Sequence, residues 1–462
     1  MATTTTECFD DIRPFYDEEI PAAMQRIVDS NFFGLLCTYV YPGRDPAEVR
    51  TMMLSFRTIR DFQLEVMRCV NEQVISRSTT AFTYSGVEQL DPQKRYLFVS
   101  NHRDIMLDAC LLQYILYKNG HETTEITFGA NLMSSPLVTD IGKCNKMFRV
   151  ERGGNMRDFY LSSQHLSNYI RYVLTQKGQS LWIAQRNGRT KDGCDQTDQG
   201  IVKMFCMSEP ADKIKALSEL NIIPVSVSYE WESCDILKAL ELYQSRQQPY
   251  VKKPGEDLNS ILTGIMQRKG RVHFTFCQPL TEADLRQFDG CTTNEYHRQV
   301  AHLLDQRIIG AYRLWPNNYI AHDLRYGQQH YADRYTAEER EAFMQRMKKL
   351  ETFDTSESDV LRDIFLGIYS NPVDMRSKLL DSRDAVACFA GAQEQLKQRN
   401  LVGAIALLTK AVVLKPDYTE AYMMRGQLRY GIGDKEGAKS DMQKVLELDP
   451  NLLASLSGDF SL

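Results

Sequence analysis

The chain has 462 residues, of which 43% are hydrophobic and 25% charged, a composition typical of a folded protein of two to three domains. A formal net charge of -5 and a pI of about 6.0 exclude a global electrostatic attraction to nucleic acid. An anionic ligand would therefore have to be held by a local cluster of arginines.

Cysteine usage and the apolar segments indicate the compartment. The eleven cysteines include no Cys-x-x-Cys pair, a pattern of reduced cytosolic thiols rather than of a disulfide scaffold or a zinc site. Residues 1–14 lack the basic start and apolar centre of a signal peptide. The apolar stretches 32–41 and 109–117 fall well short of the roughly 20 residues that span a bilayer. We expect a cytoplasmic protein, either free or peripheral on the inner face of the membrane.

Residues 1–85 are predicted to form a helical N-terminal region. After a turn at Pro42-Gly43, apolar residues recur at spacings of three and four among polar neighbours. These residues are Phe56, Ile59, Phe62, Val66 and Val70.

Residues 86–310 are predicted to form an α/β domain, because short apolar runs alternate there with longer amphipathic segments. One of these segments, 155–177, is a helix candidate that ends at Gly178, the residue type that favours a helix C-terminus. The predicted strands are 96–100, 126–130, 147–150, 181–184, 222–229 and 272–277.

The remaining chain is predicted to be a helical connector, 311–380, and a repeat segment, 381–462. Residues 338–349 have helical character within the connector. Ala392, Ala404 and the tripeptide 414–416 recur as Gly426, Ala438 and 448–450, each 34 positions later. This period resembles that of tetratricopeptide repeats. Two such repeats rarely bury enough surface alone, so we expect them to pack on the rest of the chain or on a protein partner.

One segment carries the residues of a candidate catalytic base. The apolar run 96–100 is followed by Asn101 and His102, with Asp104 and Asp108 close behind. A histidine accepts a proton near neutral pH, and a carboxylate can fix its tautomer and stabilise the imidazolium. The place where a strand meets a helix is where α/β folds put ligand-binding groups.

Three further blocks follow in order: Phe148–Gly154, Trp182–Gly193 and Ile222–Val227. Together with the Asn101-His102 block they resemble the glycerolipid acyltransferase family, over about residues 85–300. The resemblance implies a mixed sheet flanked by helices. It also implies acyl transfer, from acyl-CoA or acyl carrier protein to a hydroxyl of glycerol phosphate or lysophosphatidate. Neither a metal nor a redox cofactor is expected, and no nucleic acid partner.

The resemblance also implies roles for individual residues. His102 matches the base that deprotonates the acceptor hydroxyl, and Arg152 and Arg189 match the basic residues that hold the acceptor phosphate. The neighbouring substrate-binding candidates in the same blocks are Arg149, Arg186, Asn187 and Gly188. A structural alternative for Arg149 and Arg152 is pairing with Glu151 or Asp158.

Two departures from the family pattern leave alternatives open. Five residues separate His102 from Asp108 where the family has four, so the partner is Asp108, which we favour, or Asp104. The third block lacks the family's glutamate, whose place is taken by Arg186 or Asn187. The altered block suggests an alternative acceptor, an amino-acid-linked or other non-phosphate lyso-lipid. A separate alternative is a non-catalytic scaffold with an acyltransferase fold that acts through its repeats.

Overall fold

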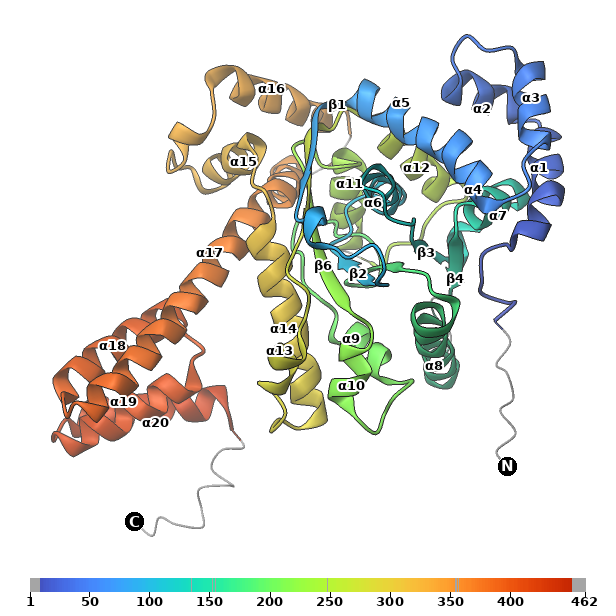
Figure 1. Cartoon of the computed structure of the whole chain (residues 1–462). Helices are drawn as coiled ribbons and strands as arrows, with labels where there is room; N and C mark the ends of the chain where they lie inside the picture. Colours follow the sequence, from blue (N-terminus) through green and yellow to red (C-terminus); the bar gives the residue numbers. More distant parts are fainter. Residues whose placement is uncertain are drawn as a thin grey trace, which may run out of the picture. The chain divides into compact units, whose positions relative to one another are not determined.

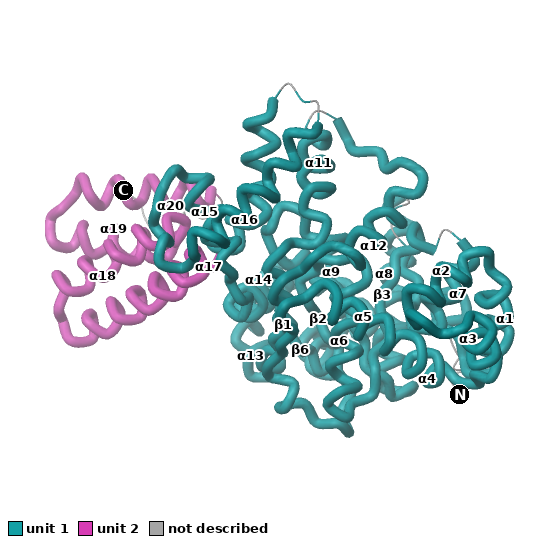
Figure 2. The backbone as a smooth tube through the Cα atoms, turned by 90° about the horizontal axis from the view of Figure 1, so that it is seen from above, with its two compact units in different colours: residues 1–373 teal, residues 374–462 magenta. Residues whose placement is uncertain are grey.

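The computed structural model describes residues 9–450 except 134, 152, 154, 247, 354 and 356. Backbone contacts divide the chain into two compact units, Met1–Val373 and Asp374–Leu462 (Figure 2). The long helix α17 (Ser358–Lys397) contains the boundary between them. The finer division at residues 85, 310 and 380 remains a prediction.

The N-terminal region is helical as far as Ser78 and then forms a strand that the sequence analysis missed. Its helices are α1 (Ile20–Val28), α2 (Phe33–Val40), α3 (Pro46–Leu54), α4 (Ile59–Phe62) and α5 (Arg68–Ser78). Strand β1 (Thr79–Ser85) pairs in parallel with β7 (Gly270–Phe276). The segment is rich in Thr and aromatic residues, which favour strands. It lies at the edge of the sheet, where side chains on both faces are largely accessible, so it lacks the apolar alternation by which a strand is found.

The predicted mixed sheet is confirmed. It has seven strands in the order β1-β7-β6-β2-β5-β3-β4. The central strand β2 (Leu97–Ser100) lies between β5 (Leu181–Ala184) and β6 (Ile222–Tyr229) and is parallel to both. On one side follow β3 (Glu125–Gly129) and β4 (Met147–Val150), also parallel, whereas β7 runs antiparallel to β6.

Helices cover both faces of the sheet, as Figure 1 shows. Successive side chains of a strand point to opposite faces, so Phe98 joins one apolar cluster while Leu97 and Val99 join another. The Phe98 cluster includes residues of α5 and α6 (Leu107–Lys118), and the other includes residues of α8 (Met156–Tyr172) and α14 (Thr293–Ala311). Burial on both faces explains why the parallel strands read as nearly continuous apolar runs.

The other helices of this unit lie between and after the strands. They are α7 (Pro136–Cys144), α9 (Gln199–Cys206), α10 (Lys213–Ser218), α11 (Asp235–Ser245), α12 (Glu256–Met266), α13 (Glu282–Arg286), α15 (Pro316–Tyr326) and α16 (Ala337–Met347). Asn155 caps the start of α8, and Gly178, with a φ of 68°, ends the helical segment that continues from it. None of the helices in the described ranges is long and apolar enough to cross a membrane.

The second unit contains α18 (Leu401–Leu414), α19 (Thr419–Gly431) and α20 (Lys435–Leu448) after the end of α17. Helix α20 begins and ends 34 positions after α18, and both are capped by an amide or carboxylate, from Asn400 and Asp434. Ala404 and Ala438 are buried where helices pack. The repeat period seen in the sequence is therefore a period of the structure.

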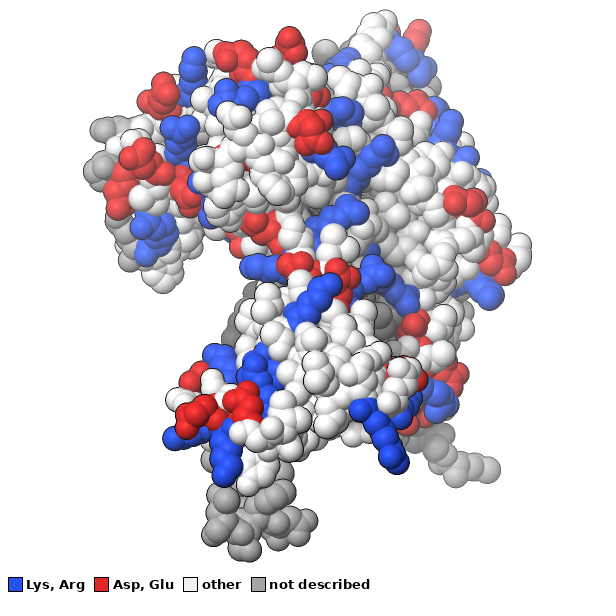
Figure 3. All heavy atoms as spheres, turned by 90° about the vertical axis from the view of Figure 1, so that its left-hand side faces the viewer, with Lys and Arg blue, Asp and Glu red and all other residues white. Residues whose placement is uncertain are grey.

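Charged side chains of both signs lie on the face drawn in Figure 3, in groups separated by uncharged areas. Lysines and arginines lie among aspartates and glutamates there, and neither sign covers a large continuous area. On this face nothing resembles the basic stripe that binds nucleic acid.

Candidate active site

The candidate site lies where the carboxyl ends of the parallel strands β5, β2 and β6 meet. The backbone turns away from β2 at Asn101, whose side chain donates to the carbonyl of Val227 (2.9 Å) and accepts from its backbone N–H (2.7 Å). This pair of hydrogen bonds to β6 fixes the start of the loop that carries His102. Ligands of open α/β sheets bind at such strand ends.

His102 and Asp108 form a hydrogen-bonded pair, with 2.9 Å between Nδ1 and Oδ2. The His102 residue is 7% exposed and Asp108 is fully buried, in the first turn of α6. An ionised carboxylate only accepts hydrogen bonds, so Nδ1 carries the proton. Nε2 makes no hydrogen bond to any described residue, which leaves its lone pair available to a ligand. The ring also packs edge-on against Trp182, with 5.4 Å between ring centroids.

Asp108 is held by donors on every side. Its Oδ2 also accepts from the backbone N–H groups of Arg103 (2.6 Å) and Asp104 (2.9 Å). The Tyr229 hydroxyl, at the end of β6, donates to Oδ1 (2.8 Å). Burial first, and then the adjacent Asp108, raises the pKa of Tyr229 well above its usual value, so the phenol stays protonated as a donor. The chain wraps around this carboxylate, which explains how five intervening residues are accommodated.

Asp104 has a different role from the one considered in the sequence analysis. Its Oδ1 accepts from the backbone N–H groups of Met106 and Leu107 (both 2.9 Å), and its Oδ2 accepts from the Ser233 hydroxyl. Within the described residues, Asp104 makes no hydrogen bond to His102. A side chain at Gly264 would collide with Oδ2, since a Cβ there would lie 2.3 Å away. Asp104 thus orders the start of α6 and the packing of α12.

The loop after β5 brings Arg189 beside His102. The backbone N–H of Thr190 donates to the carbonyl of His102 (2.7 Å). Gly188 adopts a φ of 75°, a left-handed conformation that suits glycine. Arg189 is half-buried, and its Nη1 is buried without a hydrogen-bond partner in the part of the chain that the structure describes. A buried guanidinium nitrogen left unpaired is costly, so this donor is suited to an anionic ligand.

The other predicted binding residues contribute less to this cluster. Arg186 donates to the carbonyl of Cys194 (3.3 Å), and Asn187 is exposed. Arg149 lies on β4, which β5 and β3 separate from β2, and it pairs with Glu151 (2.7 Å), the structural alternative considered for it. Arg152 lies outside the described residues.

A buried ionic network that the sequence analysis missed joins the two loops of the site. Asp195 accepts from Asn101 Nδ2 (2.9 Å), from the Arg103 guanidinium (2.6 Å) and from the Thr190 hydroxyl (2.7 Å). Burial would lower the pKa of Arg103, but Asp195 and further groups that include Glu232 hold it well above the usual value. Asp195 therefore bridges the loop of His102 and the loop of Arg189.

Two other contacts support this network from behind. Lys238 of α11 donates to the carbonyl of Arg103 (2.7 Å) and to Glu232 (2.6 Å). Helix α17 packs against Gly193, where a Cβ would lie 2.3 Å from the carbonyl oxygen of Ile368.

Within the described residues, no group of three or more His, Cys, Asp or Glu side chains is placed to hold a metal ion.

Comparison with known proteins identifies the class to which this site belongs. A model of the acyltransferase family matches residues 81–228, which contain β2, β5, all of β6 but its last residue, His102, Asp108 and Arg189. Residues 81–228, about a third of the chain, therefore match an acyltransferase domain. His102, Asp108, Arg189 and Asp195 lie within that domain, and Tyr229 directly follows it.

Two individual proteins are similar over parts of the chain. The structure of the 1-acyl-sn-glycerophosphate (LPA) acyltransferase PlsC from Thermotoga maritima aligns with 62% of this chain and 94% of that one. The alignment has 11% identity and a TM-score of 0.31, too low to support an argument. A TPR repeat-containing protein of Rhizobium etli is 31% identical over 67 residues, which cover 14% of this chain. The chain spans about a third of the length of that curated relative, 33%.

Proposed function

We propose that the protein moves a fatty acyl group from a thioester donor to the hydroxyl of a glycerol-phosphate or lysophosphatidate acceptor. One observation carries the proposal: the His102 imidazole is anchored through Nδ1 to buried Asp108 while Nε2 has no partner among the described residues. This is the arrangement of a general base whose tautomer is fixed. The acyltransferase family model over residues 81–228 supports the reaction class.

In the proposed reaction His102 Nε2 takes the proton of the acceptor hydroxyl, and the oxygen attacks the thioester carbonyl. The tetrahedral intermediate then collapses and expels the thiolate, which receives the proton from the imidazolium. The products are an ester and a free thiol. Asp108 orients the ring and stabilises the imidazolium, and Tyr229 with two backbone donors keeps Asp108 in position. Backbone N–H groups of the Gly188 loop are the candidate donors to the oxyanion.

The unpaired, buried Nη1 of Arg189 supports a phosphate-bearing acceptor. Guanidinium groups bind phosphate oxygens through two parallel hydrogen bonds. The link from Thr190 to the His102 carbonyl sets the distance between this anion-binding group and the base. Arg152 remains the second phosphate-binding candidate, on the basis of the sequence.

The proposal includes an acyl-CoA or acyl carrier protein donor, no metal or redox cofactor, and a cytoplasmic location that includes the inner membrane surface. Exposed apolar residues support the membrane-surface alternative. On α8, Met156 is 91% exposed, and Phe159 and Tyr160 lie beside it on the same helix face, each 56% exposed. Such a face binds the interface of a bilayer without crossing it.

A second candidate acceptor is a lyso-lipid without phosphate, such as one linked to an amino acid. Arg149 is already paired with Glu151, and Arg186 donates to a backbone carbonyl. Among the described candidate arginines, only Arg189 has a buried donor without a partner. A single arginine offers a phosphate group fewer hydrogen bonds than two arginines would.

The test is acyl transfer from labelled acyl-CoA and acyl carrier protein to glycerol-3-phosphate, lysophosphatidate and a non-phosphate lyso-lipid. The wild-type protein is compared with His102→Ala and with the control His165→Ala, which removes another histidine that contacts a carboxylate, Asp11. We expect product that depends on His102 and not on His165, with a phosphate-bearing acceptor. Turnover retained by His102→Ala would contradict the mechanism. Absence of product with every pair would favour the scaffold that acts through its repeats.

A further inference from the structure

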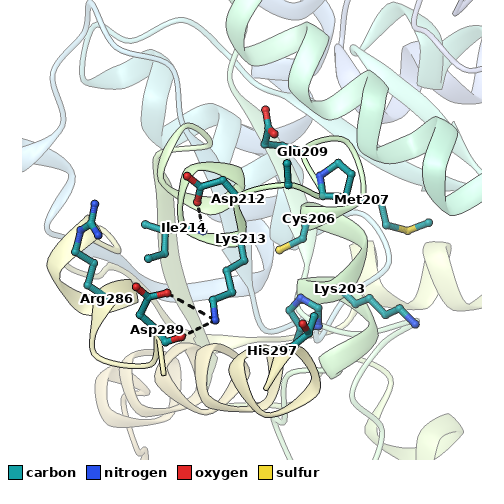
Figure 4. A pocket seen from close by; sticks show the side chains of 13 residues that line it. Lys203, Cys206, Met207, Glu209, Asp212, Lys213, Ile214, Arg286, Asp289 and His297 are labelled. Atoms are coloured by element: carbon teal, nitrogen blue, oxygen red, sulfur yellow. Dashed lines mark hydrogen bonds and ion pairs between the residues drawn. The ribbon is translucent and has the colours of Figure 1, made fainter. Parts of the chain in front are cut away.

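A cavity of about 560 Å³ lies away from the residues of the acyltransferase site, among α9, α10, α13 and α14 (Figure 4). Its walls combine apolar side chains, which include Met207 and Ile214, with the cationic side chains of Lys203 and Lys213. None of its lining residues, all within the described ranges, forms a hydrogen bond with His102, Asp108 or Arg189. The acyl-transfer proposal assigns no role to this cavity.

His297 is the polar side chain of this cavity that lacks partners. The residue is 4% exposed, and neither ring nitrogen has a hydrogen-bond partner in the described ranges. Figure 4 shows its imidazole projecting from α14 toward α9. A neutral imidazole has one N–H donor and one acceptor, and buried polar groups of native proteins are nearly always paired. The partner of His297 is therefore expected inside the cavity.

Two ammonium groups act on that ring: Lys203 has no ion-pair partner in the described ranges, and Lys213 is paired with Asp289. Lys203 also makes no hydrogen bond with any described residue. Lys213 donates to the carbonyls of Asp289 (2.8 Å) and Cys291 (3.3 Å), while the nearest carboxylate oxygen of Asp289 lies 3.7 Å away. Burial, followed by the charges of Lys203 and Lys213, lowers the pKa of His297, so both charges act on the ring.

The acidic residues of the wall are already occupied, Asp289 by its ion pair with Lys213. Glu209 pairs with Lys215 (2.9 Å), which is not part of the lining, and Asp212 accepts the backbone N–H groups that begin α10. Arg286, the third cation, pairs with Glu282 (2.8 Å). The groups without a partner are thus the Lys203 ammonium group and the neutral His297 imidazole, both of which can donate a hydrogen bond to an anion, with Lys213 beside them.

We propose that this cavity binds an organic phosphate. The phosphate would lie between Lys203 and Lys213 and accept the N–H of His297, because charge-assisted hydrogen bonds from ammonium groups are strong. The organic part would contact Met207 and Ile214, since the cavity is far larger than a bare phosphate and falls in the size range of small-molecule sites. This inference does not depend on the acyl-transfer reaction.

The test is isothermal titration calorimetry of the full chain with inorganic phosphate and with AMP. We expect AMP to bind more tightly than phosphate, and Lys203→Met and His297→Gln each to weaken AMP binding about tenfold or more. Lys203 is exposed, so its variant tests the site even where His297→Gln destabilises α14. The matched control is Arg298→Met, which removes an adjacent, 68% exposed cation paired with Glu295, and it should bind AMP like the wild type.

Three results would overturn the proposal. The first is no measurable heat with either probe at millimolar concentration, or binding that is unchanged in both cavity variants. The second is equal affinity for phosphate and AMP, which would remove the organic part of the assignment. The third is AMP binding that survives both variants but is lost in Arg189→Met, which would place the ligand at the acyltransferase site.

Discussion

Both units of the molecule contain a buried arginine–aspartate pair, but the two pairs are assembled over very different sequence distances. In the repeat unit Arg425 donates to Asp441, which lies 16 residues away in the sequence, on the neighbouring helix. In the acyltransferase unit Arg103 donates to Asp195, which lies 92 residues away in the sequence. The first pair belongs to a local helical hairpin, whereas the second exists only because the sheet brings β2 and β5 together. A local period can reveal the first kind of contact and not the second.

The largest effect should come from Asp108, the carboxylate that holds the base. Asp108→Asn is expected to lower kcat/KM for acyl transfer about 10²- to 10⁴-fold, because an amide no longer stabilises the imidazolium. The matched control is Asp104→Asn, another buried carboxylate of the same loop without a contact to His102. Measuring kcat/KM for both variants decides whether Asp108 or Asp104 is the partner of His102. A larger loss in Asp104→Asn would transfer the partner role to Asp104.

The two buried pairs can be broken separately. Asp195→Asn should lower the free energy of unfolding of the first unit by about 3 kcal/mol and reduce acyl transfer, because it leaves Arg103 partly unpaired between two loops. Asp441→Asn should destabilise the repeat unit similarly, since both Arg425 and Arg429 bind that carboxylate. Denaturant unfolding and activity assays measure the two effects. Loss of acyl transfer in Asp441→Asn without unfolding would mean that the units depend on each other.

A further comparison separates the arginines that the sequence analysis grouped together. Arg189→Met should raise KM for a phosphate-bearing acceptor about 10- to 100-fold, the value of one or two charge-assisted hydrogen bonds. Arg149→Met should change it less than about twofold, because Arg149 is a half-exposed partner of Glu151. Steady-state kinetics with the acceptor varied provide the measurement. Equal effects of the two substitutions would contradict the geometry.

The smallest effect concerns Asp305. Burial raises the pKa of this carboxyl to about 6. A pKa raised in the folded state contributes stability at low pH that is lost as pH rises through about 6. Asp305→Asn keeps an acceptor for the Thr197 N–H (2.7 Å) but removes the buried charge. At pH 7 the variant should be more stable by about 2–3 kcal/mol, with the difference gone near pH 4. Denaturant midpoints between pH 4 and 7 test this, and a constant difference would refute it.

The sequence predicted the elements of this fold better than it predicted their long-range contacts. Six strands and the 34-residue period were found because apolar runs and small residues are local signals. Strand β1 was missed because an exposed edge strand shows no such run. The motif around His102 was visible for the same local reason, since both candidate carboxylates lie within six positions of it.

The supporting residues of the site could not be predicted in that way. Tyr229 and Asp108 are 121 residues apart in the sequence, and Asp195 and Asn101 are 94 residues apart. Only the order of strands in the sheet places them together. The one available signal was that Tyr229 ends a predicted strand, 222–229, at the edge of the sheet where binding groups gather.

The most direct test of the account is a double-substitution cycle on His102 and Asp108. Single-turnover rates of acyl transfer are measured for the wild type, His102→Ala, Asp108→Asn and the double variant, with the best acceptor. Since Asp108 acts through His102, the double variant should be no slower than His102→Ala alone. Additive losses would show that Asp108 acts independently of the histidine and would contradict the proposed base.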